Sequence, residues 1–152
     1  MQEFPFSADE WDAVTASGNR LVNATLADDS VLRDVLLREF FELLAQLRAR
    51  HGEHPVLLET EADYLDDPLE RKHRYEAALR LARENHLPTF TICIFFAQLL
   101  MDEFDDVHRA AEILASCRDE IERDADPYYR GEWTQLVGRT AREIAGEREP
   151  RK

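Results

Sequence analysis

Two histidines three residues apart, His51 and His54, are the first residues in this sequence that could bind a metal ion. They flank Gly52 near the predicted end of a helix. No cysteine or carboxylate accompanies them at a spacing known for zinc sites. We therefore predict that both are exposed loop histidines and that the chain holds no metal. The other three are isolated in the sequence and are expected on the surface: His73, His86 and His108.

Two acidic segments could supply cation ligands or acid–base groups. The segment 102–106 is rich in carboxylates, but it lacks the bend glycine and the distal bidentate glutamate of an EF-hand loop. The segment 59–63 carries three carboxylates, and such groups do acid–base chemistry only where a cleft shifts their pKa values. Burial of Glu59, Glu61 and His73 in one place would favour an enzyme or a small-ligand protein.

Other signatures of catalysis are missing from the sequence. The five glycines are scattered, so there is no phosphate-binding loop, and no nucleophile elbow occurs. Cys93 and Cys117 lie in apolar helical contexts and are expected to be buried and unreactive. We therefore predict a protein that is not an enzyme, with no catalytic residues and no cofactor.

The charge balance restricts the kind of partner. The chain has 32 acidic and 19 basic side chains, for a net charge of −13, which repels nucleic acid and either favours a basic partner or only keeps the surface soluble. The longest apolar stretch, residues 90–101, is too short to span a bilayer. The first residues resemble no signal peptide. We expect a cytoplasmic protein that binds neither nucleic acid nor membrane.

The apolar residues recur mostly at helical spacing along the whole chain. Ser7 and Glu10 form a predicted capping box at the start of the first helix. Residues 90–96 are β-branched and aromatic and could form a strand, but the apolar run continues to Met101, which favours a buried helix.

A weak internal repeat organises these helices. Three Asp-Asp pairs, at 28–29, 66–67 and 105–106, follow one another at intervals of 38 and 39 residues. A period of this length is typical of helical solenoids, in which hairpins stack to bury their apolar faces. Each pair is expected to cap the second helix of a hairpin.

The repeat resembles a tetratricopeptide repeat. Residues 75–79, Tyr-Glu-Ala-Ala-Leu, fit its second helix, residues 110–117 fit loosely, and residues 133–136 look like the opening of a first helix. The resemblance covers about residues 55–146. The family has a period of about 34 residues, whereas the period here is 38–39 residues. Glu59 and Gln98 also depart from the family, which prefers a small residue at their positions.

The resemblance implies an all-α fold, an α–α hairpin superhelix stacked in the right-handed sense, in a single domain of residues 1–152. Three hairpins would span about 7–50, 55–86 and 88–123, followed by a C-terminal helix of about 127–146. In such a stack the first helices line a concave face. Carried onto this chain, the site would comprise Thr60, Asp63, Tyr64, Phe95, Asp102, Glu103 and Arg142, with Leu99, Thr134 and Ala141 beside them.

These residues would form an acidic groove with an aromatic floor, suited to a basic or amphipathic segment of a protein or peptide partner. We therefore predict a protein–protein interaction module. One alternative is an acidic neutralising protein of the immunity or anti-regulator type, which would bind its basic target through a convex or edge surface. Another is an enzymatic or small-ligand helical bundle. A homo-oligomer could also form through the apolar stripe of the last helix, which no other predicted element covers.

Overall fold

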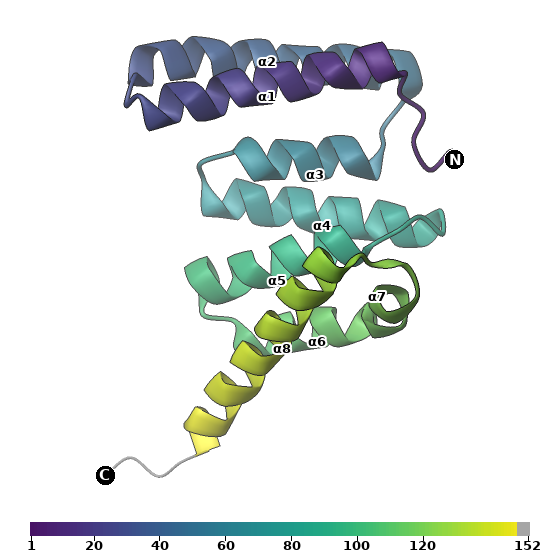
Figure 1. Cartoon of the computed structure of the whole chain (residues 1–152), viewed down its shortest axis with the longest axis vertical. Coiled ribbons are helices and arrows are strands. Elements are labelled where there is room, and N and C mark those ends of the chain that lie inside the picture. The colour runs from purple at the N-terminus through teal and green to yellow at the C-terminus, as the bar shows by residue number, and fades with distance from the viewer. Residues whose placement is uncertain (149–152) are drawn as a thin grey trace.

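The computed structural model describes residues 1–148, and throughout that range the chain is built of helices with no strand (Figure 1). The predicted all-α hairpin stack is confirmed, including the helical state of residues 90–96. Three hairpins stack along the long axis of the molecule, and the last helix lies obliquely across the third. The elements are α1 (Ala8–Leu26), α2 (Ser30–His51), α3 (Pro55–Tyr64), α4 (Pro68–Glu84), α5 (Phe90–Phe104), α6 (Val107–Ser116), α7 (Arg118–Asp124) and α8 (Pro127–Arg148).

The Asp-Asp pairs occupy equivalent positions, as predicted. The second aspartate of each pair is the N-cap of α2, α4 or α6, and its carboxylate accepts a hydrogen bond from the backbone amide three residues on, at 3.1–3.3 Å. The first aspartates differ. Asp28 and Asp105 adopt left-handed backbone conformations, with φ of 55° and 50°. Asp66 instead pairs with Arg33, with N–O distances of 2.8 and 3.0 Å.

The second helix of the third hairpin is broken, which the repeat did not predict. At the break the Ser116 hydroxyl donates to the carbonyl of Ile113 at 2.6 Å, competing with the helical hydrogen bonds there. The chain then turns into α7, whose Glu120 carboxylate accepts hydrogen bonds from the Thr89 amide at 2.6 Å and the Phe90 amide at 3.1 Å. The Thr89 side chain makes no capping hydrogen bond to α5. Glu120 takes this role, since it accepts from amides at the start of the helix.

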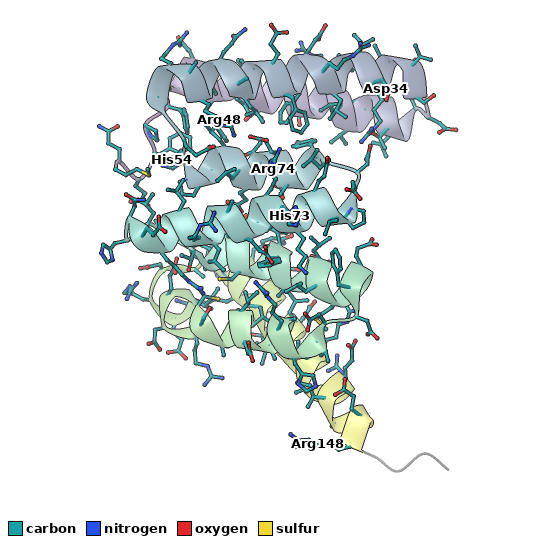
Figure 2. All side chains as sticks on the ribbon, turned by 180° about the vertical axis from the view of Figure 1, so that it is seen from behind. Asp34, Arg48, His54, His73, Arg74 and Arg148 are labelled. Atoms are coloured by element: carbon teal, nitrogen blue, oxygen red, sulfur yellow. The ribbon has the colours of Figure 1, made fainter. Side chains whose placement is uncertain are left out.

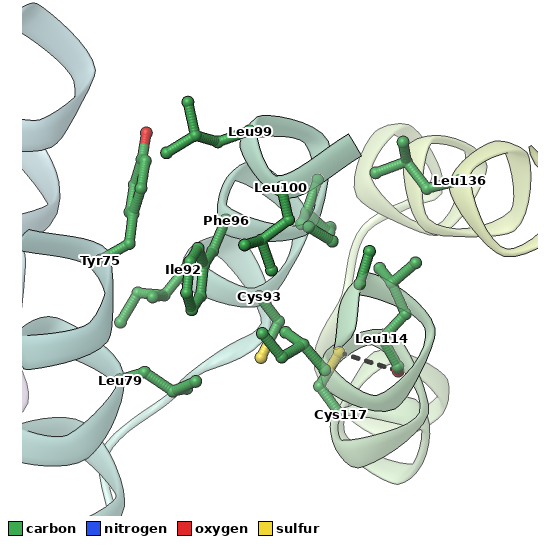
Figure 3. Close-up of a cluster of buried hydrophobic side chains, with 14 of the residues drawn as sticks. Tyr75, Leu79, Ile92, Cys93, Phe96, Leu99, Leu100, Leu114, Cys117 and Leu136 are labelled. Carbon is green, nitrogen blue, oxygen red and sulfur yellow. Dashed lines mark hydrogen bonds between the residues drawn. The ribbon is translucent and has the colours of Figure 1, made fainter. Parts of the chain in front are cut away.

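The larger core lies between α4, α5, α6 and α8 (Figure 3). Tyr75 stacks on Phe96 there, with ring centroids 6.0 Å apart. Both cysteines are buried and free, as expected. The apolar stripe of α8 packs against this core through Trp133, Leu136, Val137 and Ile144. The prediction that nothing covers this stripe is therefore wrong, and the reason for expecting self-association through it is removed.

A second, smaller core lies between α1, α2 and the start of α3. It is built of Phe6, Val14, Leu21, Phe40, Leu44, Leu47 and Leu57. Helix α3 belongs to both cores, because Leu57 packs into this one and Leu58 into the larger one. The contact of α2 with α3 is much smaller than that of α3 with α4. The first hairpin is thus joined to the rest mainly through α3.

Across residues 1–148, each helix is either too short or too polar to pass through a bilayer.

Candidate functional site

Helix α3 lies between the two cores and carries carboxylates on opposite sides. Glu61 is buried, with 4% of its surface exposed, and it points toward α2 and α4. Its carboxylate accepts hydrogen bonds from Arg48 of α2 and from Arg74 of α4, the latter at 3.0 Å. Figure 2 labels both arginines. His73 is exposed. Glu59, Glu61 and His73 are therefore not buried together, so this group of residues does not favour an enzyme.

Glu59 and Asp63 lie one helical turn apart on another side of α3. Asp63 accepts a hydrogen bond of 2.6 Å from the Tyr75 hydroxyl. Its side chain still reaches solvent, but the protein atoms around it exclude enough water to raise its pKa. The Tyr75 hydrogen bond and the charge of Arg71 oppose that rise. The negative charge of Asp63 is therefore partly stabilised by Tyr75 and Arg71.

The negative charge of Glu59 is less stabilised by its neighbours than that of Asp63. Burial raises its pKa to about 7, the neighbouring charge of Asp63 acts in the same direction, and a hydrogen bond with Thr91 of α5 opposes both. Within residues 1–148, Glu59 forms no ion pair with a lysine or arginine. A carboxylate partly withdrawn from water without a cation is energetically unfavourable, which makes Glu59 the centre of the candidate site.

The first turn of α8 brings a tyrosine to this place. Asp126 caps α8 by accepting a hydrogen bond from the Tyr129 amide at 2.9 Å. The Tyr129 ring packs edge-on against Phe90 of α5, with centroids 5.7 Å apart. Burial raises the pKa of Tyr129, and the nearby charge of Glu59 raises it further. Helices α3, α5 and α8 therefore share one electronegative face, which we call the acidic face, defined by Glu59, Asp63 and Tyr129.

Two cavities flank this face, one toward each end of α3. The α3–α5 cavity has a volume of about 200 Å³ and contains the Glu59 side chain among its walls, which are Glu3, Phe4, His54, Pro55, Val56, Glu59, Leu87, Pro88, Thr91 and Ile92. The α1–α3 cavity has a volume of about 250 Å³ and is lined by Leu21, Val22, Thr25, Leu26, Arg33, Asp63, Tyr64, Leu65 and Asp66. Each cavity is largely apolar and contains one of the two carboxylates.

His54 has a structural role that the sequence interpretation missed. The prediction that it is an exposed loop residue is wrong, because only 2% of its surface is accessible. Its Nδ1 accepts a hydrogen bond from the Val56 amide at 3.2 Å, and its Nε2 lies 2.9 Å from the carbonyl oxygen of Gln2. This pattern requires the neutral ring with its proton on Nε2. His54 thereby caps α3 and fastens the N-terminal segment, which forms one wall of the α3–α5 cavity.

His51 is exposed, and its ring lies 3.0 Å from the Glu10 carboxylate. In the part of the chain that the structure describes, no three His, Cys, Asp or Glu side chains are grouped as metal ligands.

Three of the residues predicted to bind a partner lie on or beside α3. Asp63 and Tyr64 line the α1–α3 cavity. The ring of Tyr64 packs against Phe40, with centroids 4.5 Å apart, and is largely engaged in the smaller core. The hydroxyl of Thr60 donates to the carbonyl of Val56 at 2.6 Å, within its own helix.

The remaining predicted residues lie on α5 and α8. Phe95 is half-buried against the larger core, one turn after Thr91 on α5. Asp102 is paired with Arg139 of α8 at 2.7 Å, so its charge is already neutralised. Glu103 and Arg142 are exposed. The predicted set thus contains one carboxylate of the acidic face, Asp63, but not Glu59 or Tyr129.

No family model, curated protein or solved structure matches this chain. The resemblance to tetratricopeptide repeats stays a prediction, and the function has to be argued from the site itself.

Replacing Glu59 by glutamine is expected to stabilise the protein above neutral pH. The pKa of Glu59 in the folded protein, about 7, lies above its ordinary value of 4.5, so between these values folding takes up a proton and stability falls as pH rises. Above pH 7 the full penalty is present, and Glu59→Gln removes it. The gain should be about 1–2 kcal/mol, after allowance for solvent screening, and should vanish near pH 4.

Urea unfolding of both proteins, followed by circular dichroism between about pH 4 and pH 8.5, measures this difference. Glu112→Gln on α6 is the matched control, because Glu112 is exposed and should give no pH-dependent gain. An equal effect of Glu59→Gln at both ends of the range would contradict the prediction.

Proposed function

We propose that this chain is a non-enzymatic protein–protein interaction module that binds a basic segment of a protein or peptide through its acidic face. The proposal rests on one observation: the half-buried Glu59 side chain lies in a cavity wall one turn from Asp63 and forms no ion pair with a lysine or arginine among residues 1–148. A bound lysine or arginine would supply the missing counter-charge. The resemblance to tetratricopeptide repeats is in keeping with this, since it implies that the first helices of the hairpins face a partner.

The rest of the molecule would assist such a complex. A net charge of −13 attracts a basic segment from a distance and increases its association rate at low salt. The apolar walls of the two cavities would contact aliphatic portions of the partner at either end of α3. Charge would therefore bring the partner to the protein, and the acidic face would select where it binds.

Titration with fluorescently labelled octalysine tests this proposal. We expect binding that weakens as salt is added. The double variant Glu59→Lys/Asp63→Lys should lower the affinity by about tenfold or more. The double variant Glu42→Lys/Glu112→Lys changes the net charge equally at exposed positions on α2 and α6 and should have a much smaller effect.

The outcomes separate the alternatives. Equal losses in the two double variants would show that octalysine responds only to total charge and would overturn the acidic face as the site. A larger loss in the Glu42/Glu112 variant would place binding on another surface, as expected of a neutralising protein. Absence of binding even at low salt would overturn the proposal of a basic partner.

A further inference from the structure

We infer that the α3–α5 cavity is a socket for a single lysine side chain of the partner, with Glu59 as the counter-charge of its ammonium group. This inference rests on the proposed function and specifies the residue that is recognised. The socket depends on contacts inside the cavity, whereas the proposed function depends on charge attraction at the acidic face. An experiment can therefore disprove the socket without disproving the proposed function.

The size of the cavity favours one side chain over a larger ligand. Its volume is about 200 Å³. Sites for cofactors and drug-sized ligands are typically about 300–1,000 Å³. Most of its wall is hydrocarbon, which suits the four methylene groups of lysine. The apolar residues that provide this wall are Phe4, Pro55, Val56, Leu87, Pro88 and Ile92.

The polar groups of the cavity favour an ammonium over a guanidinium group. Glu59 and Glu3 are the two carboxylates that line the cavity, and Thr91 and His54 are other polar side chains in its wall. A guanidinium group is larger than an ammonium group, and its planar fork requires both oxygens of one carboxylate to be aligned with it. An ammonium group is a compact charge whose three donors can be directed to acceptors that are not coplanar. Lysine is therefore the better match.

Among residues 1–148, no lysine or arginine lines the cavity, and its charged side chains, Glu3 and Glu59, are negative. Glu3 of the N-terminal segment lines the same cavity, Asp63 follows on α3, and Tyr129 approaches from α8. His54 also lines the cavity, but its two hydrogen bonds hold it in the neutral form. A cation entering the cavity would thus meet attraction from each of these elements and repulsion from none of them.

The mouth of the cavity is partly built by the N-terminal segment. The Phe4 ring, which is 47% exposed, contacts Phe6 and Trp11 edge-on at centroid distances of 5.3 and 5.1 Å. The hydrogen bond of His54 to Gln2 holds this segment against α3. The wall is therefore held by aromatic contacts and a tertiary hydrogen bond before any partner arrives.

The first test uses n-butylammonium, which reproduces the lysine side chain, in a titration followed by ¹H–¹⁵N NMR. Saturable shifts are expected at residues 54–59 and 87–92. Glu59→Gln should weaken binding about tenfold or more, whereas Glu112→Gln should not change it. Butanol, which has no charge, and propylguanidinium should both bind more weakly. Equal binding by Glu59→Gln, tighter binding of propylguanidinium, or shifts located elsewhere would overturn the lysine socket.

The second test separates the socket from the general function. Octalysine is compared with the same peptide trimethylated at every Nζ, which keeps the charge but removes the hydrogen-bond donors and adds bulk. If the socket exists, octalysine binds at least several-fold tighter. If both peptides bind equally and with salt dependence, the proposed function stands and the socket is wrong. If neither binds, the proposed function itself fails.

Proton release provides a third measurement on the same complex. A bound ammonium group requires an ionised Glu59, so octalysine binding at pH 7 should release protons, measured by calorimetry in buffers of different ionisation enthalpy. Glu59→Gln should abolish the release, and its persistence in that variant would assign it to another group and overturn the role of Glu59.

Discussion

Glu61→Ala is expected to destabilise the protein by about 2–4 kcal/mol, more than any of the other substitutions proposed for this chain. Glu61 is buried between α2 and α4, and its two arginine partners come from those helices. Removing the carboxylate leaves Arg74 without its carboxylate partner and leaves Arg48 with only the more exposed Glu53, while the two guanidinium groups stay on either side of α3. Both arginines keep partial access to water, which limits the cost to less than that of two fully buried charges.

The measurement is the free energy of unfolding in urea, from circular dichroism at neutral pH. Glu53→Ala is the matched control, because Glu53 pairs with the same Arg48 but is 44% exposed in its side chain. An exposed ion pair contributes little, so this variant should lose less than about 1 kcal/mol. If Glu61→Ala cost no more than Glu53→Ala, the buried pairing would contribute nothing to stability.

Gly18→Ala should also destabilise the protein, by about 1–3 kcal/mol, although alanine is intrinsically the better helix former by about 1 kcal/mol. A Cβ atom at position 18 would lie 2.5 Å from the Tyr64 hydroxyl oxygen and 3.1 Å from Cζ of the same ring. The ring cannot easily move away, because it packs against Phe40. The steric cost therefore exceeds the gain in helix propensity.

Two further variants isolate this cause. Gly131→Ala in α8, where a new Cβ would meet nothing within 4 Å, should be stabilising by up to about 1 kcal/mol. Combining Gly18→Ala with Tyr64→Phe removes the closer of the two contacts and should recover part of the loss. Thermal unfolding reports both, since 1 kcal/mol corresponds to roughly 2–4 °C at this chain length. A loss in Gly18→Ala that Tyr64→Phe does not reduce would point to another cause.

The helix boundaries could be predicted because their determinants are local. The N-caps Asp29, Asp67 and Asp106 satisfy amides only three residues away, so their spacing alone indicated the repeat. The break at Cys117 could not be predicted in this way. It positions Glu120 to cap a helix that begins 30 residues earlier in the chain. The need for Gly18 in α1 could not be predicted in this way either, because the Tyr64 ring that requires it belongs to α3.

The candidate site was predictable only in part, for a similar reason. Asp63 was identified from its place in the repeat. Glu59 was considered as a possible acid–base group and as a departure from the family pattern, but not as part of the partner-binding site, although its position one turn before Asp63 indicated a shared face. Its unusual environment depends on Thr91 and Tyr129, which tertiary packing brings from α5 and α8. His54 was misjudged because its partner is the backbone carbonyl of Gln2, 52 residues earlier in the chain.

The boundary between α2 and α3 is crossed by polar links in addition to the apolar contacts of Leu57 and Tyr64. Arg33 binds Asp66 near one end, and Arg48 reaches Glu61 nearer the other. Dispersion forces tolerate sliding, whereas paired charges hold a register. The two arginine links therefore help to fix the register of the first hairpin on the rest of the stack, together with the apolar packing of Leu57 and Tyr64.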